Sequence, residues 1–475
     1  MNSLLTALLL LAGTVIVVVL PGGAAAVLVC AAASLVVVGA LTRVQDERVF
    51  LLQVFAGALL SRMVIGSLIY GLRLQDFFGG DAYGYDHLGN LLLGSWTAPR
   101  SGLIQSSTTD YTATEPGYGM AYLVAVIYWV AGRNMLATQF FNAVLGAATA
   151  PVIFMCARHI FQNLRAARMA ALFVAFYPSL VLWSSQGLKD GPIVFLLATS
   201  MLATLKRGER LRAKYFALLV LSLLSLLTLR FYVFYMVAAA AAGAFVIGMR
   251  KFSTWGLVRQ LTLMAVAGLT LTYLGVLRTA GEQLDTYGNL EKVQQTREWQ
   301  VRVAKSGFGK DVDVSTTSGA LTAIPVGLVY LLLAPFPWQL ASLRQSITLP
   351  EMVAWWGSLP LLALGLYFTL KWRLRQALPI LIFTTMLTLA YSIFQGNVGT
   401  AYRQRSQLLV FYFIFVAVGY VLVRERAEER KRRAQEYKQS QVERVQAMRR
   451  YSRWNRKRGR ELEDVARDIS ERVGF

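Results

Sequence analysis

Charged side chains of the types that carry out group transfer lie in short polar segments between long apolar ones. A carboxylate can take the proton of a hydroxyl group as a new bond forms, and such general-base help accelerates a reaction by about 10² to 10⁴. Arginine and lysine can hold the negative charge that develops on a departing phosphate. The candidates are Asp81, Asp86 and Glu115 in a first segment, Lys189 and Asp190 in a second, Arg230 at a further predicted outer turn, and Arg403 and Arg405 in the last.

This set of residues predicts transfer of a group from a lipid-linked phosphate donor, with both reacting partners at the outer membrane surface. Structural alternatives remain open for every candidate except Arg230, which is harder to explain in this way. Asp81 follows two glycines and also suits a helix N-cap or a turn. Asp86 also suits a solvated helix surface, and Glu115 begins a Glu-Pro-Gly turn sequence. The Lys-Asp pair also suits a charge pair at a membrane boundary, and Arg403 and Arg405 also suit headgroup anchors.

The elements that position these residues are predicted to be membrane-spanning helices. Hydrophobic residues form 56% of the 475-residue chain and charged residues only 16%, whereas charged residues form about a quarter of water-soluble domains. Apolar runs of about 17 to 25 residues recur along the chain, which is the length that a helix needs to cross about 30 Å of hydrocarbon. We therefore predict an all-α polytopic membrane protein.

The net charge of +22 indicates membrane orientation rather than nucleic-acid binding. Lysine and arginine gather in short clusters between apolar runs and in the C-terminal tail, which is where the positive-inside rule expects cytoplasmic segments. We expect no nucleic-acid partner, and we expect the tail to be a helix that leans on anionic lipid headgroups. Cys30 and Cys156 lie in apolar segments, which favours neither a disulfide framework nor a cysteine-based metal site.

Charge and run length together predict about twelve crossings, with both termini cytoplasmic. The apolar segment 120–130 is too short to cross comfortably. A crossing by 320–338 would place the basic residues that follow the next run outside, so we expect both segments to be juxtamembrane or re-entrant. The predicted crossings are 3–20, 24–41, 49–72, 135–157, 167–185, 191–205, a tight pair around Arg230, 260–277, 351–370, 377–395 and 407–423.

This topology places two long polar loops, 73–119 and 278–319, on the outside.

Arg62 falls near the middle of an apolar run, and such a residue is a functional candidate by default because a charge in the membrane is costly. The predicted parts are an N-terminal transmembrane hairpin at 1–48, a transmembrane catalytic domain at 49–423, and a basic cytoplasmic helical tail at 424–475.

Three stretches resemble the GT-C superfamily of membrane glycosyltransferases, and in particular its protein O-mannosyltransferase and aminoarabinose transferase group. They are GGDAYGYDHLGNLLLGSW from Gly79, TEPGYG from Thr114, and the long segment 122–192. The resemblance implies a GT-C-like helix bundle in the plasma (inner) membrane, with an extracytoplasmic active site and a juxtamembrane helix at 120–130. It also implies a polyprenyl-phosphate-linked sugar donor.

The resemblance also implies roles for individual residues. Asp81, with Tyr85 one helical turn later, matches the catalytic carboxylate of the family, which would deprotonate the acceptor and invert the anomeric carbon. Glu115 and Asp190 match acids that shape the pocket or hold a metal. The residues expected to bind the donor phosphate are Lys189, Arg403 and Arg405, with Arg230 as a further candidate.

The sequence departs from the family pattern at three places. The familiar Asp-Glu pair is Asp81-Ala82 here, the Lys-Pro-Pro segment reads Glu-Pro-Gly, and an additional helical hairpin precedes the first family helix. The first two departures leave a divalent metal and the donor's identity open, and no cofactor is certain. The acceptor is a lipid, a glycan or a protein, and membrane lipids are further partners.

Other functions fit parts of the same pattern. A polymerase or ligase of surface polysaccharide would share the arginine-rich external loops but would use a diphosphate-linked oligosaccharide. A lipid-glycan transporter would show broken helices and internal repeats with charges at the membrane midplane. Arg62 suits that alternative, whereas the long acidic external loop and the absence of an evident repeat do not. A non-catalytic membrane scaffold is indicated only by the basic tail.

Overall fold

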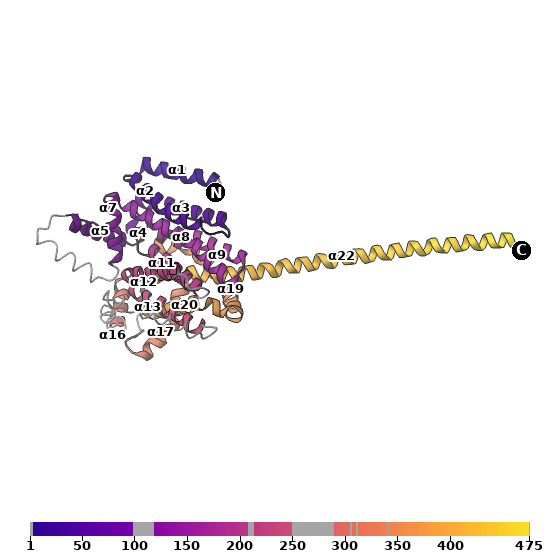
Figure 1. The fold of residues 1–475 in the computed structure, drawn as a ribbon. Helices are drawn as coiled ribbons and strands as arrows, with labels where there is room; N and C mark the ends of the chain where they lie inside the picture. Colours follow the sequence, from indigo (N-terminus) through magenta and orange to yellow (C-terminus); the bar gives the residue numbers. More distant parts are fainter. Residues whose placement is uncertain are drawn as a thin grey trace. The chain divides into compact units, whose positions relative to one another are not determined.

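The computed structural model describes residues 3–97, 118–207, 213–248, 289–304, 306–309, 312–340 and 342–474. Throughout these ranges the regular elements are helices, which confirms the predicted all-α membrane fold (Figure 1). The first half contains α1 (Ser3–Val19), α2 (Gly23–Leu41), α3 (Arg48–Gly71), α4 (Gln75–Phe78), α5 (Asp81–Thr97), α7 (Gly119–Ala131), α8 (Met135–Phe161), α9 (Leu164–Phe176), α10 (Pro178–Ser184) and α11 (Asp190–Arg207). The second half contains α12 (Ala213–Leu229), α13 (Phe231–Gly248), α16 (Leu290–Val303), α17 (Thr317–Leu333), α18 (Leu343–Ile347), α19 (Leu349–Trp372), α20 (Leu374–Phe394), α21 (Val398–Gln404) and α22 (Ser406–Val473).

Six of the described helices are long and apolar enough to cross a membrane: α2, α3, α8, α19, α20 and α22. The pair α9 and α10, bent by 54° at a short break, adds a seventh span if it is counted as one. Five shorter apolar helices are α1, α7, α12, α13 and α17. The chain is thus a multi-pass membrane protein. The expected crossing at 260–277 lies outside the described residues, so the number of about twelve crossings stays a prediction.

Helix α8 is buried along most of its length and packs against α2, α3, α9 and α11. Small residues permit this close packing, because a Cβ atom added at Gly146 would meet Ser184 Cβ at 2.4 Å and Arg62 Nε at 2.9 Å. Helix α1 packs against α2 and α3, so α1 and α2 form a helical hairpin (Figure 1).

Arg62 lies buried in α3 and binds the bend between α9 and α10. Pro178 has no N–H, so it leaves the carbonyl of Val174 without its usual helical donor. The Arg62 guanidinium donates to the carbonyls of Ala175 at 2.8 Å and Val174 at 3.5 Å, and to Ser184 Oγ at 2.8 Å. The charge in this apolar run therefore satisfies backbone groups that the bend exposes, which is a structural explanation for Arg62.

The segment between α3 and α8 leaves the bundle and returns at the same end. Helices α5 and α7 run antiparallel, since Leu92 packs against Ala121 and Ala125 while Asp86 contacts the far end of α7. At the start of α8, Asn134 Nδ2 donates to the carbonyl of Gly22 at 2.8 Å, in the turn next to the end of α3. A segment that begins and ends at one side makes no net crossing, and α7 would be only about 20 Å long. This arrangement supports the expected juxtamembrane position of 120–130.

Helix α17 crosses the end of α20. Near its start Ala320 and Ala323 belong to a cluster that packs against Ile393 and Phe394, and after its last turn Ala334 packs against Val398. Both ends of α17 thus meet residues within a few positions of the end of α20. This supports the expectation that 320–338 does not cross the membrane.

The chain divides into two compact units, Met1–Gly419 and Tyr420–Phe475. The second unit is the later part of α22, and its exposed surface carries Glu and Arg or Lys pairs four residues apart, such as Arg424 with Glu428 at 3.0 Å. The expected helical tail is therefore a helix, with charge spacing that stabilises isolated helices.

Candidate active site

Arg403, in α21, lies between two carboxylates that are far apart in the sequence. Its Nη1 donates to Asp81 Oδ2 at 2.5 Å, and its Nε and Nη2 donate to Asp190 Oδ2 at 2.7 and 2.6 Å. The two acids differ in exposure, since the side chain of Asp190 is 1% exposed and that of Asp81 is 51% exposed. One guanidinium therefore joins a buried carboxylate to one that faces the surroundings.

Each member of this group stands at the end of a helix. Asp81 and Asp190 begin α5 and α11, where a carboxylate is favoured by the positive end of the helix dipole. Arg403 is near the end of α21, a short helix between α20 and α22, where a cation is favoured. Its guanidinium also lies 5.6 Å from the ring centroid of Trp183, which covers one side of it. Side chains at the ends of three different helices are thereby gathered at one end of the bundle.

These side chains line a cavity of about 430 Å³, within the size range of ligand pockets. Asp81 and Tyr85 enter it from one face of α5, because residues four apart lie on the same side of a helix. Lys189, Arg230, Arg344 and Arg403 line the same cavity and bring four cationic side chains to it. A half-exposed carboxylate and four cations thus share one cavity.

A second cavity of about 260 Å³ adjoins the first and shares Lys189, Arg230 and Gln404 with it. Lys292 of α16 adds a further cation, and none of the described residues that line this cavity is acidic. Arg230 is the junction between α12 and α13, and its Nη1 atom is buried without a hydrogen-bond partner among the described residues. An unpaired buried guanidinium N–H is costly, so a ligand with acceptor oxygens would stabilise it.

The charges of the site alter the pKa values of its titratable groups. Burial, with help from Arg230, lowers the pKa of Lys189 to about 8. Burial acts to raise the pKa of Asp190, but Arg403, Arg230 and Lys189 outweigh it and hold the pKa below its usual range. Burial and the neighbouring Asp190 raise the pKa of Tyr85 to about 12. At neutral pH the site therefore presents an ionised Asp190, a mostly charged Lys189 and a neutral Tyr85.

Two of the sequence candidates lie elsewhere, and a third cannot be placed. Asp86 faces away from Asp81 and binds Tyr128 Oη at 2.5 Å and Arg133 Nη2 at 2.6 Å, so it ties α5 to the end of α7. Arg405 is 1% exposed and does not line either cavity. Glu115 lies outside the described residues.

Arg405 satisfies the carbonyl end of α17. Its Nη1 and Nη2 atoms each donate at 2.8 Å, to the carbonyls of Leu332 and Ala334. Trp355 Nε1 also donates to Leu332 at 2.6 Å. A cation at a helix C-terminus is favoured by the dipole, so the position of Arg405 is explained by helix capping. Of the two arginines in the Arg-x-Arg sequence, the structure brings only Arg403 to the cavity.

Four residues of the site region were missed by the sequence reasoning, and one of them is Arg344, an exposed arginine that also lines the first cavity. Trp183 lies within an apolar run, and nothing in the sequence distinguishes it from core residues. Lys292 is one charge among many in the second polar loop. Glu351 is a buried carboxylate that accepts from Tyr402 Oη at 2.9 Å, and its position near the start of an apolar run was the one available indication.

The divalent metal that the sequence left open does not fit the described part of the site. Among the described residues, no three His, Cys, Asp or Glu side chains gather in a way that could hold a metal ion. The guanidinium of Arg403 also lies between the carboxylates of Asp81 and Asp190, where a bridging cation would have to be. The positive charge at this position is supplied by the chain itself.

Residues 110–226 match the family model for dolichyl-phosphate-mannose-protein mannosyltransferase, a family of glycosyltransferases. The match covers about a quarter of the chain and includes Lys189, Asp190 and the stretch that holds Glu115. A comparison with curated protein sequences finds no match. The family match confirms the resemblance of this part of the chain to the protein O-mannosyltransferase group of the GT-C superfamily.

Proposed function

We propose that the protein is a glycosyltransferase that moves a sugar from a polyprenyl-phosphate carrier to a hydroxyl acceptor at the outer face of the membrane, with both of its termini cytoplasmic. The observation that carries this proposal is the pairing of the half-exposed Asp81 with four cationic side chains in one cavity. The family match to glycosyltransferases that use a lipid-phosphate sugar supports it.

Asp81 is the general base in this mechanism. Arg403 occupies its Oδ2 atom, which leaves Oδ1 to accept the proton of the acceptor hydroxyl. Asp190 does not suit this role, because its side chain is 1% exposed and is held by Arg403. The acceptor oxygen then forms a bond to the anomeric carbon as the bond from that carbon to the phosphate oxygen breaks. Attack opposite the leaving group inverts the anomeric carbon.

Arg230 and Lys189 hold the carrier phosphate as its negative charge increases. Arg230 has a buried N–H with no partner in the part of the chain that the structure describes, and Lys189 lines the wall that both cavities share. Charge-assisted hydrogen bonds of this kind are stronger than neutral ones and strengthen as the leaving group departs. Arg403 orients Asp81 and neutralises Asp190 and is a third contact for the phosphate.

Substitution of Asp81 by asparagine tests the proposal. The volume and hydrogen-bond acceptor of the side chain are kept while the base is removed, so transfer from radiolabelled polyprenyl-phosphate mannose in membranes should fall by about 10² to 10⁴. Donor binding should persist. Asp76→Asn is the matched control, because Asp76 is a nearby acid in α4 that does not line the cavity. Transfer that survives Asp81→Asn, or that Asp76→Asn removes equally, would show that Asp81 is not the base.

A second candidate function is polymerisation or ligation with a diphosphate-linked oligosaccharide. The cavity lined by Lys189, Arg230 and Lys292 favours it, because a second phosphate would find three cations there. Competition separates the two candidates. A polyprenyl monophosphate should inhibit the proposed enzyme better than a polyprenyl diphosphate, whereas the reverse order and sensitivity to Lys292→Gln would indicate the diphosphate donor.

A further inference from the structure

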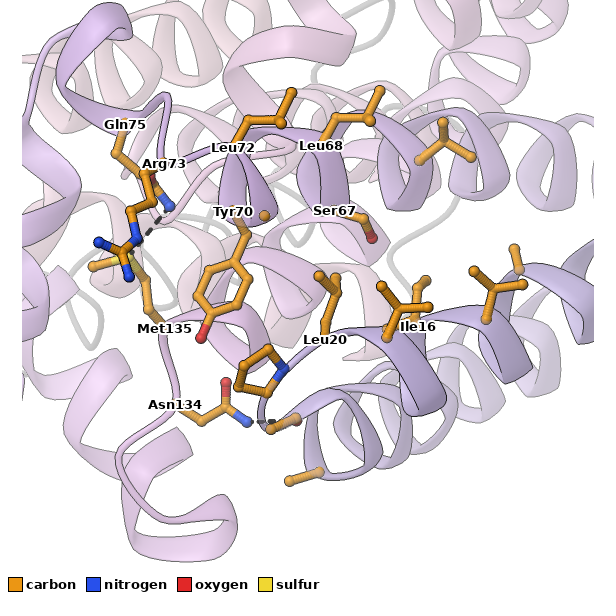
Figure 2. A pocket seen from close by; sticks show the side chains of 18 of the residues that line it. Ile16, Leu20, Ser67, Leu68, Tyr70, Leu72, Arg73, Gln75, Asn134 and Met135 are labelled. Carbon is orange, nitrogen blue, oxygen red and sulfur yellow. Dashed lines mark hydrogen bonds between the residues drawn. The ribbon is translucent and has the colours of Figure 1, made fainter.

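A large groove lies between α1 and α3, on the other side of α5 from the candidate active site. Its volume is about 1550 Å³, which exceeds the roughly 300 to 1,000 Å³ of small-molecule pockets. Its walls are mostly aliphatic side chains of α1 and α3. Figure 2 shows Ile16 of α1, and Leu20 just after this helix, facing Ser67 and Tyr70 of α3 across the groove. The groove therefore has the dimensions and chemistry of a site for a lipid chain.

The length of the groove also suits a lipid. Helix α1 has 17 residues and is about 25 Å long, which exceeds one leaflet's share of the roughly 30 Å of hydrocarbon. Several side chains along it, among them Leu11 and Val15, are half or more exposed in the described chain. An acyl chain bound in the groove would cover the exposed surface of these side chains over the depth of one leaflet.

One end of the groove is polar and carries a net positive charge. Arg73, Gln75 and Asn134 gather there, together with Arg133 and Asp86 (Figure 2). The charge of Asp86 is already paired with Arg133 at 2.6 Å. Arg73 has no ion-pair partner among the described residues, and it lies exposed just after the end of α3. A phosphate beside Arg73 would complement this charge.

The groove is distinct from the donor site because the two lie on different faces of α5. Asp81 and Tyr85 line the active-site cavity, whereas Tyr83 and Asp86 line the groove. Tyr83 Oη also donates to Gln75 Oε1 at 3.4 Å, across the polar end. One phosphate cannot meet both Arg230 and Arg73 from opposite sides of a helix. The groove thus needs an occupant other than the sugar donor.

We propose that the groove between α1 and α3 binds an anionic phospholipid, with its acyl chains along α1 and its phosphate at Arg73. The N-terminal hairpin supplies one wall of this site, and α3 and α5 supply other residues of its lining. Because Tyr83 and Asp86 belong to α5, the headgroup also braces the helix that begins with Asp81.

Native mass spectrometry of delipidated protein, titrated with phosphatidylglycerol or with phosphatidylcholine, tests the proposal without relying on enzymatic activity. The wild type should bind phosphatidylglycerol about fivefold more tightly, the ratio that corresponds to about 1 kcal/mol per basic residue. Arg73→Gln should remove this preference. The matched control is Arg43→Gln, which removes the same charge from an exposed arginine at the opposite end of α2 and should keep the preference.

A second variant tests the apolar part of the site. Ser67 lines the groove from α3, and Ser67→Phe should weaken the binding of both lipids by filling the space while Arg73 is intact. Equal binding of the two lipids by the wild type would overturn the proposal. An equal loss of preference in Arg73→Gln and Arg43→Gln would also overturn it, because the charge would then act through the membrane surface as a whole.

Discussion

The two ion pairs of Arg403 should contribute very differently to stability. Asp190 is 1% exposed, and its Oδ1 atom is buried without a hydrogen-bond partner among the described residues. Arg403→Gln would remove the guanidinium that donates twice to this carboxylate. Removing one partner of a buried pair costs about 3 to 5 kcal/mol, because the other charge is left uncompensated. Arg230 and Lys189 remain close to Asp190 and offset part of this, so we expect a loss near the lower end.

The pair with Asp81 should contribute little. The side chain of Asp81 is 51% exposed, and ion pairs with exposed partners contribute about 0.2 to 1 kcal/mol. Two double-mutant cycles therefore make a sharp comparison. The coupling energy of Arg403→Gln with Asp190→Asn should be several kcal/mol, and that with Asp81→Asn should be at most about 1 kcal/mol.

The coupling energies can be measured by titrating the purified protein in mixed micelles with a denaturing detergent and following helix content. Asp81→Asn serves as the internal control, since it removes the same charge from the same arginine. Equal coupling energies for the two pairs would refute the reasoning, because the difference in burial would then have no energetic consequence. A large coupling to Asp81 alone would reverse the assigned roles, with Asp81 structural and Asp190 available for chemistry.

Two further outcomes are expected. The pKa of Lys189 is about 8, so this residue loses its charge as the pH rises through that value, and the KM for the donor should then increase. Lys189→Arg should remove the increase, because arginine stays charged. A KM that is constant from pH 7 to 9.5 in the wild type would argue against a donor contact. Arg62→Leu should lower the apparent free energy of unfolding by about 1 to 3 kcal/mol, because the carbonyl of Ala175 loses its hydrogen-bond donor. The KM for the sugar donor should stay unchanged. Loss of transfer at unchanged stability would instead indicate a functional charge.

Much of the membrane architecture follows from local properties of the sequence. Apolar runs predict helices because a chain in hydrocarbon must satisfy its backbone groups internally. The lengths of the helices at 48–71 and 135–161, the tight pair around Arg230 and the helix that follows Gly80 all agree with those expectations. The short helix at 119–131 also agrees with the prediction, since a helix of 13 residues is too short to span the hydrocarbon core of the membrane.

The roles of the arginines could not be predicted from the sequence. Arg62, Arg403 and Arg405 all lie in or beside apolar runs, and the sequence indicates only that each needs a partner. The partners of Arg62 and Arg405 are carbonyls at a bend and at a helix end, whereas the partners of Arg403 are two carboxylates. These partners are more than 70 residues away in the chain, so no local pattern contains them.

The sequence by itself determined that the chain is a helical membrane protein with acids and bases placed between its apolar runs, because both features depend on residue type and spacing alone. It also contained enough of a family pattern to predict lipid-phosphate sugar chemistry, with Asp81 as the predicted base. Only the tertiary structure decided which charges meet. In the folded chain Asp190 is buried and Asp81 is half-exposed, although both bind the same guanidinium. Asp86 pairs with Arg133 after the end of α7, and Arg405 donates to carbonyls at the end of α17. Burial and orientation depend on neighbours from distant parts of the chain, and they set the chemistry that each charge can do.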